Sequence, residues 1–208
     1  MTLSFFLGIF LAYMLGSIPT AVWIGIVFHG IDVREHGSGN AGATNVIRVL
    51  GPRAGLPVLL FDVFKAWLAV YLANFFAPDY YSQNQIVNFK IACGSLAVLG
   101  HVFPLFANFK GGKGVATLVG VILAMYPIAF PIILVWFILA LISTGYVSVG
   151  SITSSALLPI LVILVFREKD LSLIILSILV AIFVPLTHRK NIHRLLRGQE
   201  SKFRLYKK

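Results

Sequence analysis

The sequence contains few charged residues, and most of those are basic. Only 12% of the 208 residues are charged, with 17 Lys and Arg against seven Asp and Glu, while 59% are hydrophobic. Soluble domains are roughly half apolar and about one quarter charged, and disordered chains are more polar still. Together with a mean hydropathy of +0.93, this composition excludes the soluble, disordered and fibrous classes. It predicts an integral membrane protein.

Cysteine and aspartate are also scarce. The single cysteine, Cys93, lies inside an apolar run, so the chain can form neither an internal disulfide nor a cluster that needs two thiols. The four aspartates, Asp32, Asp62, Asp79 and Asp170, show no paired spacing. We therefore expect Cys93 to be a small buried apolar residue, and we expect no metal site and no cofactor.

Long apolar runs dominate the rest of the chain, at about residues 3–28, 54–76, 88–106, 115–143, 146–166 and 171–187. A helix rises about 1.5 Å per residue, so runs of this length can cross a hydrocarbon core of about 30 Å. The first run lacks a basic start and a small-residue cleavage site, which indicates a retained span and not a signal peptide. We expect one polytopic membrane domain over residues 1–208.

The basic residues indicate the orientation. Thirteen of the 17 lie in the loop at 29–53, in the loop at 107–114 or after the last span. The positive-inside rule places these segments in the cytoplasm and the N-terminus in the periplasm. An even number of crossings must then separate Lys113 from Arg189. A break of the apolar run 115–143 near Pro127 and Pro131 meets this condition. It gives seven transmembrane helices in an all-α protein, and the first helix formed from this run is about twelve residues long. The competing six-span topology puts eight basic residues outside.

The first cytoplasmic segment is rich in glycine and small polar residues. Residues 29–51 read HGIDVREHGSGNAGATNVIRVLG. We call residues 29–51 the first glycine-rich segment. Gly37, Gly39 and Gly42 allow positive φ or close backbone approach.

A short helix is expected at the end of this segment. Ser38 or Asn40 can cap a helix that ends near Gly51, and on that helix Thr44 and Arg48 share a face. Free N–H groups at a helix start, with hydroxyls and an arginine nearby, are typical of a phosphate site. The alternative is a glycine-rich connector between spans.

The second glycine-rich segment, residues 101–117, reads HVFPLFANFKGGKGVAT. Gly111, Gly112 and Gly114 surround Lys113 directly before an apolar helix, so amides, a helix dipole and an ammonium group converge. The spacing is not that of a nucleotide P-loop, and no strand precedes it. The alternative is a positively charged turn without a ligand.

The tail segment, residues 188–200, reads HRKNIHRLLRGQE. Apolar residues recur at helical spacing among basic ones, which predicts a helix at an anionic membrane surface. Asn191, His193 and Arg194 emerge directly from the last span and are candidates for a site.

Two features inside the spans are interpreted as structural. Asp62 and Lys65 are three residues apart and are expected to pair. Ser17 and Pro19 are expected to bend the first span.

Taken in series, these motifs resemble one known family, the bacterial membrane acylphosphate:glycerol-3-phosphate acyltransferases. The motifs are GSIP at 16–19, IDVREHGSGNAGATNVIRVLG at 31–51, FKGGKGVAT at 109–117 and NIxRLxxGxE at 191–200. They follow the family's order and extend over nearly the whole chain. The resemblance implies a bacterial inner-membrane enzyme whose active site faces the cytoplasm, with motif segments at 29–53, 107–117 and 188–200.

The resemblance also implies a reaction. An acyl group passes from acyl phosphate to the 1-hydroxyl of sn-glycerol 3-phosphate, giving lysophosphatidate and phosphate, the first acylation of phospholipid synthesis. The catalytic candidates are His193, Asn191 and Lys113. The substrate-binding candidates are Ser38, Gly39, Asn40, Thr44, Asn45, Arg48, Lys110, Gly111, Gly112, Gly114, Thr117, Arg194 and Glu200. Other glycerolipid acyltransferases carry His-x-x-x-x-Asp, which none of the five histidines begins.

The residues leave other functions open, and the resemblance implies the partners. A small-anion transporter or a phosphate-binding membrane protein is the alternative, although the glycine motifs lie at membrane edges and no repeat relates the two halves. A CDP-alcohol phosphotransferase would need several metal-binding aspartates. The expected partners are the two substrates, anionic membrane lipids and, transiently, the soluble enzyme that makes acyl phosphate. Nucleic acid is not expected, and the protein is expected to be a monomer.

Overall fold

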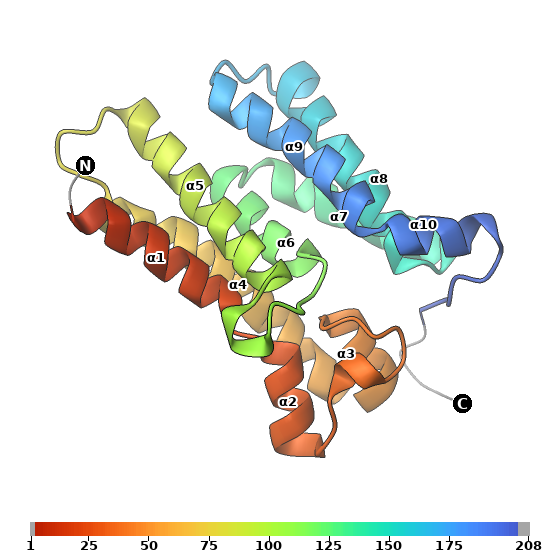
Figure 1. Cartoon of the computed structure of the whole chain (residues 1–208). Helices are drawn as coiled ribbons and strands as arrows, with labels where there is room; N and C mark the ends of the chain where they lie inside the picture. The colour runs from red at the N-terminus through yellow and green to blue at the C-terminus, as the bar shows by residue number, and fades with distance from the viewer. Residues whose placement is uncertain (1–2, 204–208) are drawn as a thin grey trace. The chain divides into compact units, whose positions relative to one another are not determined.

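The structure is a computed structural model that describes residues 3–203. Within these residues the secondary structure is helical throughout, without a strand (Figure 1). The chain folds as two compact units, one ending at Ala124 and the other beginning at Met125.

The first unit contains the N-terminal helices and both glycine-rich segments. Its elements are α1 (Leu3–Ser17), α2 (Thr20–His29), the 3₁₀ helix η1 (Val33–Glu35), α3 (Ala43–Leu50), α4 (Pro52–Phe76), α5 (Gln83–Val102), the 3₁₀ helix η2 (Leu105–Ala107) and α6 (Val115–Met125), whose last residue already belongs to the second unit. Helices α1, α4 and α5 pack against one another.

Small residues allow these helices to approach closely. A Cβ on Gly16 of α1 would lie 2.1 Å from the carbonyl oxygen of Ala97 in α5. A Cβ on Gly100 of α5 would lie 2.5 Å from the main-chain carbonyl oxygen of Tyr13. After Ser17 the chain bends by 43° into α2. Pro19, which has no N–H to continue the helix, lies at this break and confirms the expected bend.

Helix α3 is fixed to α4 by an equally close contact. Gly51 has φ +89° and reverses the chain between the two helices. A Cβ on Gly55 would lie 2.2 Å from Cγ1 of Ile47. The apolar face of α3 joins a core shared with α2, η1 and α4, formed by Ala21, Val33, Ala43, Val46, Ala54 and Val58. This core is the base on which the first glycine-rich segment lies.

The start of α3 differs from the sequence expectation. Its N-cap is Gly42, in extended conformation and without a side-chain cap, so neither Ser38 nor Asn40 caps the helix. The expected end is confirmed, because α3 stops at Leu50 before Gly51. The capping prediction was wrong because the Ser38 hydroxyl bonds to Asn45.

The second unit is a helical bundle with a short terminal helix. It contains α7 (Ala129–Thr144), α8 (Val147–Ile160), the π-helix η3 (Leu161–Val165), α9 (Leu171–Thr187) and α10 (Arg189–Leu196). Helix α8 packs against α7 and α9. The break expected near Pro127 is confirmed, since α6 ends at Met125 and α7 starts at Ala129.

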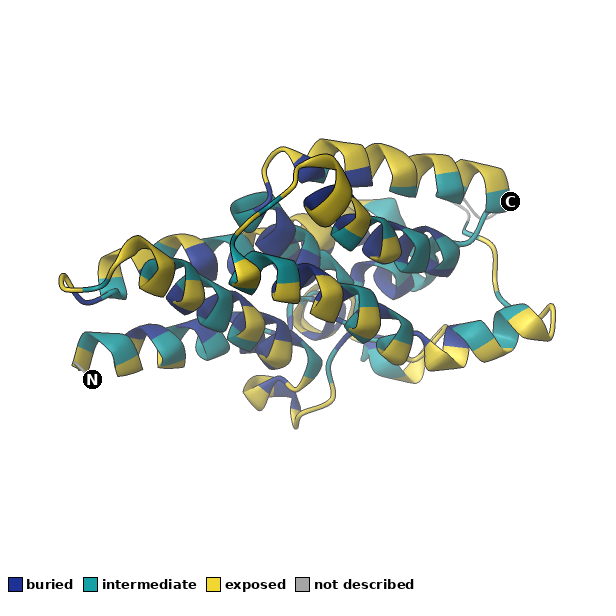
Figure 2. Ribbon diagram, turned by 90° about the horizontal axis from the view of Figure 1, so that it is seen from above, coloured by how far each residue is buried: buried dark blue, intermediate teal, exposed yellow. Residues whose placement is uncertain are grey.

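Many large apolar side chains are exposed, as in a membrane protein. Ile142 is 76% exposed and Phe28 is also 76% exposed, and Figure 2 shows exposed faces along the helices. Among residues 3–203, three helical segments are long and apolar enough to cross a membrane, and up to five if each bent helix pair counts as one span. Helices α6 and α7, with 11 and 16 residues, are shorter than this length criterion.

Candidate functional site

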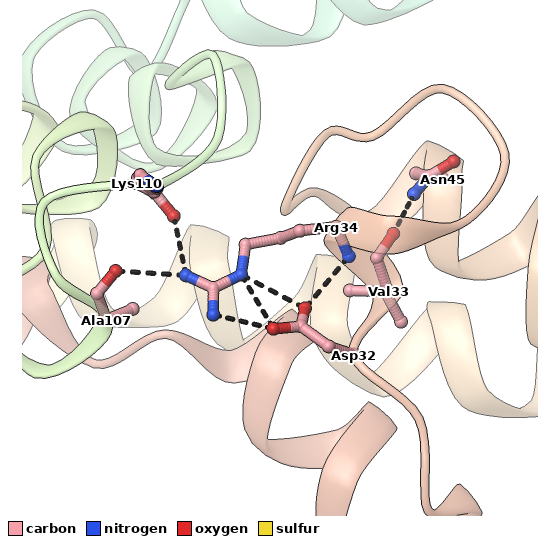
Figure 3. A network of polar contacts seen from close by, with 6 residues as sticks. All are labelled: Asp32, Val33, Arg34, Asn45, Ala107 and Lys110. Carbon is pink, nitrogen blue, oxygen red and sulfur yellow. Dashed lines mark hydrogen bonds and ion pairs between the residues drawn. The ribbon is translucent and has the colours of Figure 1, made fainter.

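The first glycine-rich segment is held in shape by an arginine–aspartate pair. Asp32 caps η1 by accepting a hydrogen bond from the Arg34 backbone N–H at 2.9 Å. The Arg34 guanidinium donates hydrogen bonds to the same carboxylate from Nε at 3.0 Å and from Nη2 at 2.6 Å. Its Nη1 donates to the carbonyl oxygens of Ala107 at 2.9 Å and Lys110 at 3.4 Å (Figure 3). One side chain thus ties the first glycine-rich segment to the second.

The electrostatics of this pair favour the charged form of both groups. The side-chain hydrogen bond from Arg34 is the main cause that lowers the pKa of Asp32 below its usual value. The same bond raises the pKa of Arg34. Sequence analysis did not select Arg34 as a site residue. The available signal was the Asp-x-Arg spacing in the first glycine-rich segment.

Asn45 organises the same loop from the buried side of α3. It is 1% exposed, and its Oδ1 accepts hydrogen bonds from the Ser38 amide at 2.8 Å and hydroxyl at 3.0 Å. Its Nδ2 donates to the carbonyl oxygens of Val33 and His36 at 2.8 and 3.1 Å. Both residues were expected to bind substrate. The structure shows that the polar atoms of Asn45 hold the loop and leave Ser38 exposed at its surface.

The second glycine-rich segment folds back over the end of α5. Gly111 N–H donates to the Val102 carbonyl oxygen at 3.2 Å, and Gly112 N–H donates to that of His101 at 3.1 Å. Helix ends leave carbonyls without intrahelical partners, and these two amides satisfy them. The expected phosphate cradle therefore needs a correction, because the amides of Gly111 and Gly112 already donate to the helix.

Lys113 follows directly and is half-buried. Gly114 has φ +81°, and its carbonyl oxygen accepts from the Leu118 amide and the Thr117 hydroxyl, each at 2.8 Å. Thr117, 0% exposed, therefore shapes the start of α6. This segment carries the cations Lys110 and Lys113 directly before the first amides of α6, at the positive end of its dipole.

The two glycine-rich segments also meet at Gly112. A Cβ there would lie 3.0 Å from the Ala41 carbonyl oxygen and 2.2 Å from Nε2 of His101. Only glycine fits between these groups. The first unit thus brings the two glycine-rich segments into contact at Gly112 and Ala41, and at Arg34 with Ala107 and Lys110.

Several of the predicted cationic and polar residues lie on these two segments. Arg48 and Thr44 are half-buried on α3, and Lys110 is exposed. Within residues 3–203, no hydrogen bond or ion pair engages the Arg48 guanidinium, which leaves it available for an anion. Gly39 is exposed with φ +72°, and Asn40 is half-buried beside Gly42. These groups are suited to bind a phosphate.

The tail residues form a separate cluster within the second unit. Glu200 accepts hydrogen bonds from Ser148 of α8 at 2.9 Å, from Nδ2 of Asn191, and from Arg194 at 2.7 Å. Burial alone would raise the pKa of Glu200, but these bonds outweigh it and lower the pKa. Glu200 was expected to bind substrate. The structure shows its carboxylate occupied in fixing Asn191, which is buried, and Arg194.

The two tail histidines differ in their surroundings. His193, expected to be catalytic, is exposed on α10. His188, not selected from the sequence, is 3% exposed, with Nδ1 2.8 Å from the Val184 carbonyl oxygen. A carbonyl only accepts, so Nδ1 carries the hydrogen there. Within the described residues no group of three or more His, Cys, Asp or Glu side chains could hold a metal ion.

Comparisons with known proteins show the family to which the chain belongs. A family model described as glycerol-3-phosphate acyltransferase matches residues 6–198. A protein of that name from Fusobacterium nucleatum subsp. nucleatum is 46% identical over 202 residues, 97% of this chain and 100% of its own length. Another from Listeria monocytogenes is 44% identical, over 98% of this chain and 99% of its own.

A solved structure is similar over nearly the whole chain. It is a crystal structure of PlsY, an integral membrane glycerol 3-phosphate acyltransferase, in its glycerol 3-phosphate form. The TM-score is 0.83 at 32% identity, covering 97% of this chain and 96% of that one. The resemblance expected from the motifs is confirmed, and the chain belongs to the glycerol-3-phosphate acyltransferase family.

Proposed function

We propose that this protein transfers an acyl group from acyl phosphate to the 1-hydroxyl of sn-glycerol 3-phosphate. The hydroxyl oxygen forms a bond to the acyl carbon, the bond from that carbon to the phosphate oxygen breaks, and inorganic phosphate leaves. The hydroxyl proton passes to a base. The observation that carries the proposal is the junction of the two glycine-rich segments, with Lys113 and Arg48, in a member of this family.

The chemistry needs alignment and charge neutralisation more than a strong nucleophile. Acyl phosphate is a mixed anhydride with a good leaving group, so no covalent acyl-enzyme is required. Holding two reactants in line can supply roughly 7–11 kcal/mol. Two phosphates carrying up to four negative charges also repel each other strongly at close range, so cations must flank both.

The cations of the first unit suit this task. We assign Lys113, with the first amides of α6, to one phosphate, and Arg48 with Ser38 to the other. Lys110, Thr44, Gly39 and Asn40 lie on the same two segments and complete the proposed binding surface. Arg34 is a positioning residue, because its guanidinium is occupied by Asp32 and by carbonyls of the second segment.

The tail is proposed to contribute through its motif residues. Asn191 and His193 are candidates for the group that orients or receives the hydroxyl proton, a role that rests on the order of the family's motifs. A phosphate oxygen of the substrate is the alternative base. Glu200 supports Asn191 and Arg194 by the bonds described above.

The proposed membrane arrangement has seven spans in the bacterial inner membrane. The short α6 and α7 each count as a crossing, and the N-terminus is periplasmic. The support is the grouping of basic residues in three segments, which the positive-inside rule places in the cytoplasm with the active site. The exposed basic face of α10 is then available to anionic lipids. The protein is proposed to act as a monomer and to receive acyl phosphate by transient contact with the soluble enzyme that makes it.

The test uses the purified protein in lipid vesicles with labelled glycerol 3-phosphate and a long-chain acyl phosphate. Label should move into the organic phase as lysophosphatidate, with one phosphate released per acyl transferred. A transporter would instead carry the label into the vesicle without esterifying it. Uptake without lipid product would reject the proposed function.

A further inference from the structure

A buried charged cluster lies beneath the second glycine-rich segment and has no part in the proposed chemistry. Asp62 and Lys65 of α4 form an ion pair at 2.7 Å, and both are 1% exposed. Thr20 donates to Asp62 Oδ1 at 3.1 Å, and Nδ1 of His101 lies 3.5 Å from the same oxygen. Lys65 also donates to the Ile18 carbonyl oxygen at 2.8 Å.

Lys65 of this cluster stabilises the break between α1 and α2. The Ile18 carbonyl oxygen lies just beyond the end of α1 and before Pro19, which offers no N–H. It accepts the Thr20 N–H at 3.0 Å and the Lys65 ammonium at 2.8 Å, a cation at the negative end of the α1 dipole. That role accounts for Lys65 and for the carboxylate that balances its charge. It does not require a histidine. Buried charges cost free energy to desolvate, so a third titratable group at the pair needs its own explanation.

His101 connects the cluster to the glycine turn in two ways. Its main-chain carbonyl accepts the Gly112 amide, and a Cβ on Gly111 would lie 2.0 Å from the same oxygen. Its ring extends from Asp62 on the Nδ1 side to Gly112 on the other, where a Cβ would lie 2.2 Å from Nε2. The ring therefore lies between a fixed carboxylate and the residue directly before Lys113.

We propose that the His101 ring is a positioning residue for the turn Gly111–Lys113. Asp62 orients the ring through Nδ1, and the Nε2 edge supports Gly112, so that Lys113 is held where the proposed phosphate site needs it. Asp62 is held in turn by Lys65 and Thr20. The importance of this device for turnover rests on the proposed function. Its effect on the turn itself does not, and can be measured without substrate.

Two substitutions test the Nδ1 side and the Nε2 side of the His101 ring separately. His101→Asn places an amide nitrogen where Nδ1 lies, so it keeps a donor for Asp62 but removes the support at Gly112. His101→Gln places its amide near the position of Nε2, so it keeps a group beside Gly112 but removes the donor to Asp62. His29→Gln, at an exposed histidine of α2, is the control.

The first readout is hydrogen–deuterium exchange of the purified protein without substrate. His101→Asn should accelerate exchange of the Gly111 and Gly112 amides at least about tenfold, while exchange in α10 stays unchanged; His101→Gln should be closer to wild type. The second readout is kinetic: His101→Asn should raise KM about tenfold with a smaller change in kcat, as expected when binding in ground and transition states is weakened alike.

A role limited to the buried cluster predicts the opposite order. His101→Asn would then match wild type in exchange at the turn and in KM, and His101→Gln would show the defect, mainly as a lower Tm. That result, or equal behaviour of the two variants at the turn, would overturn the proposal. Accelerated exchange in His101→Asn, in a protein whose wild type made no lysophosphatidate, would reject the proposed function and retain the positioning of the turn.

Discussion

The side chain of Asn45 connects α3 to the first glycine-rich segment through hydrogen bonds to Ser38, Val33 and His36. Its two donor hydrogens point at carbonyl oxygens and its oxygen receives two donors. An amide satisfied on both sides defines the orientation of the loop, because neither an acid nor an apolar side chain can replace it. Removing one buried partner leaves the other polar group without a hydrogen bond, which costs about 1–3 kcal/mol for each such group.

Asn45→Asp should therefore destabilise the protein and reduce turnover, although it removes no carbon. Its second carboxylate oxygen would face the carbonyls of Val33 and His36, which only accept. We expect a lower Tm in detergent and a higher KM for glycerol 3-phosphate. Asn88→Ala, at an exposed asparagine of α5, is the control. Unchanged Tm and KM in Asn45→Asp would contradict the organising role.

Lys113 has a different role, since it is proposed to meet a phosphate. Lys113→Ala should lower turnover about a hundredfold or more while the protein stays folded, because a fixed cation opposite developing charge is lost. Lys113→Arg should turn over little faster than Lys113→Ala, since a planar guanidinium does not replace a compact ammonium. Lys169→Ala, at an exposed lysine before α9, is the matched control. Near wild-type turnover in Lys113→Ala would mean that the segment is only a connector.

At the residue scale, the sequence identified polar residues but not how they divide between holding the loop and facing a ligand. Asn45 and Thr117 were expected to bind substrate, yet their polar atoms bond to their own loops. Arg34 was not selected because its contacts with Ala107 and Lys110 join residues more than 70 positions apart. No local pattern contains such a contact.

Helix ends determine the geometry of the second glycine-rich segment and of the Glu200 cluster in the tail. The amides of Gly111 and Gly112 satisfy the end of α5, and Glu200 joins the start of α8 to α10. In each case a segment after a helix folds back and bonds to it or to a neighbour. The sequence indicated where these helices break, through Pro19, Gly51 and Pro127. It did not indicate that the glycine amides would be used internally, because that depends on the path of the loop.

Glu200 gives the tail a pH dependence with a defined sign. Its hydrogen bonds lower its pKa below the ordinary value of 4.5. The ionised carboxylate therefore stabilises the fold above that pH, and the contribution is lost as pH falls below it. Tm in detergent should drop on acidification in wild type. Glu200→Gln should lower Tm at neutral pH and show a smaller drop, whereas Glu35→Gln, at an exposed carboxylate, should behave as wild type. Equal pH dependence in Glu200→Gln would contradict this role.

At the scale of the whole molecule, composition predicted the class and the motifs predicted the family, and both were confirmed. The number of spans is less directly readable. Helix α6 has 11 residues and α1 is bent away from α2, so helix length alone gives three to five spans within the described part of the chain. Charge in the loops carries the remaining topological information, because the lipid interface selects where Lys and Arg can lie.

The seven-span topology predicts which introduced cysteines can be labelled from outside intact cells. Asp79→Cys and Lys169→Cys lie in loops expected outside and should react with a membrane-impermeant reagent. Lys110→Cys and Gln199→Cys should react only after the membrane is opened. The native Cys93 is 1% exposed and adds little background. Ready labelling at 110 or 199 in intact cells would contradict the proposed orientation.

The most direct test of the account is the choice of acyl donor. The chain has no His-x-x-x-x-Asp motif, and its proposed site provides cations and helix amides for phosphates. Purified protein with glycerol 3-phosphate should therefore be compared on a long-chain acyl phosphate and on the acyl-CoA of the same chain length. We predict lysophosphatidate from acyl phosphate and none from acyl-CoA. Comparable rates with the two donors would contradict the central claim.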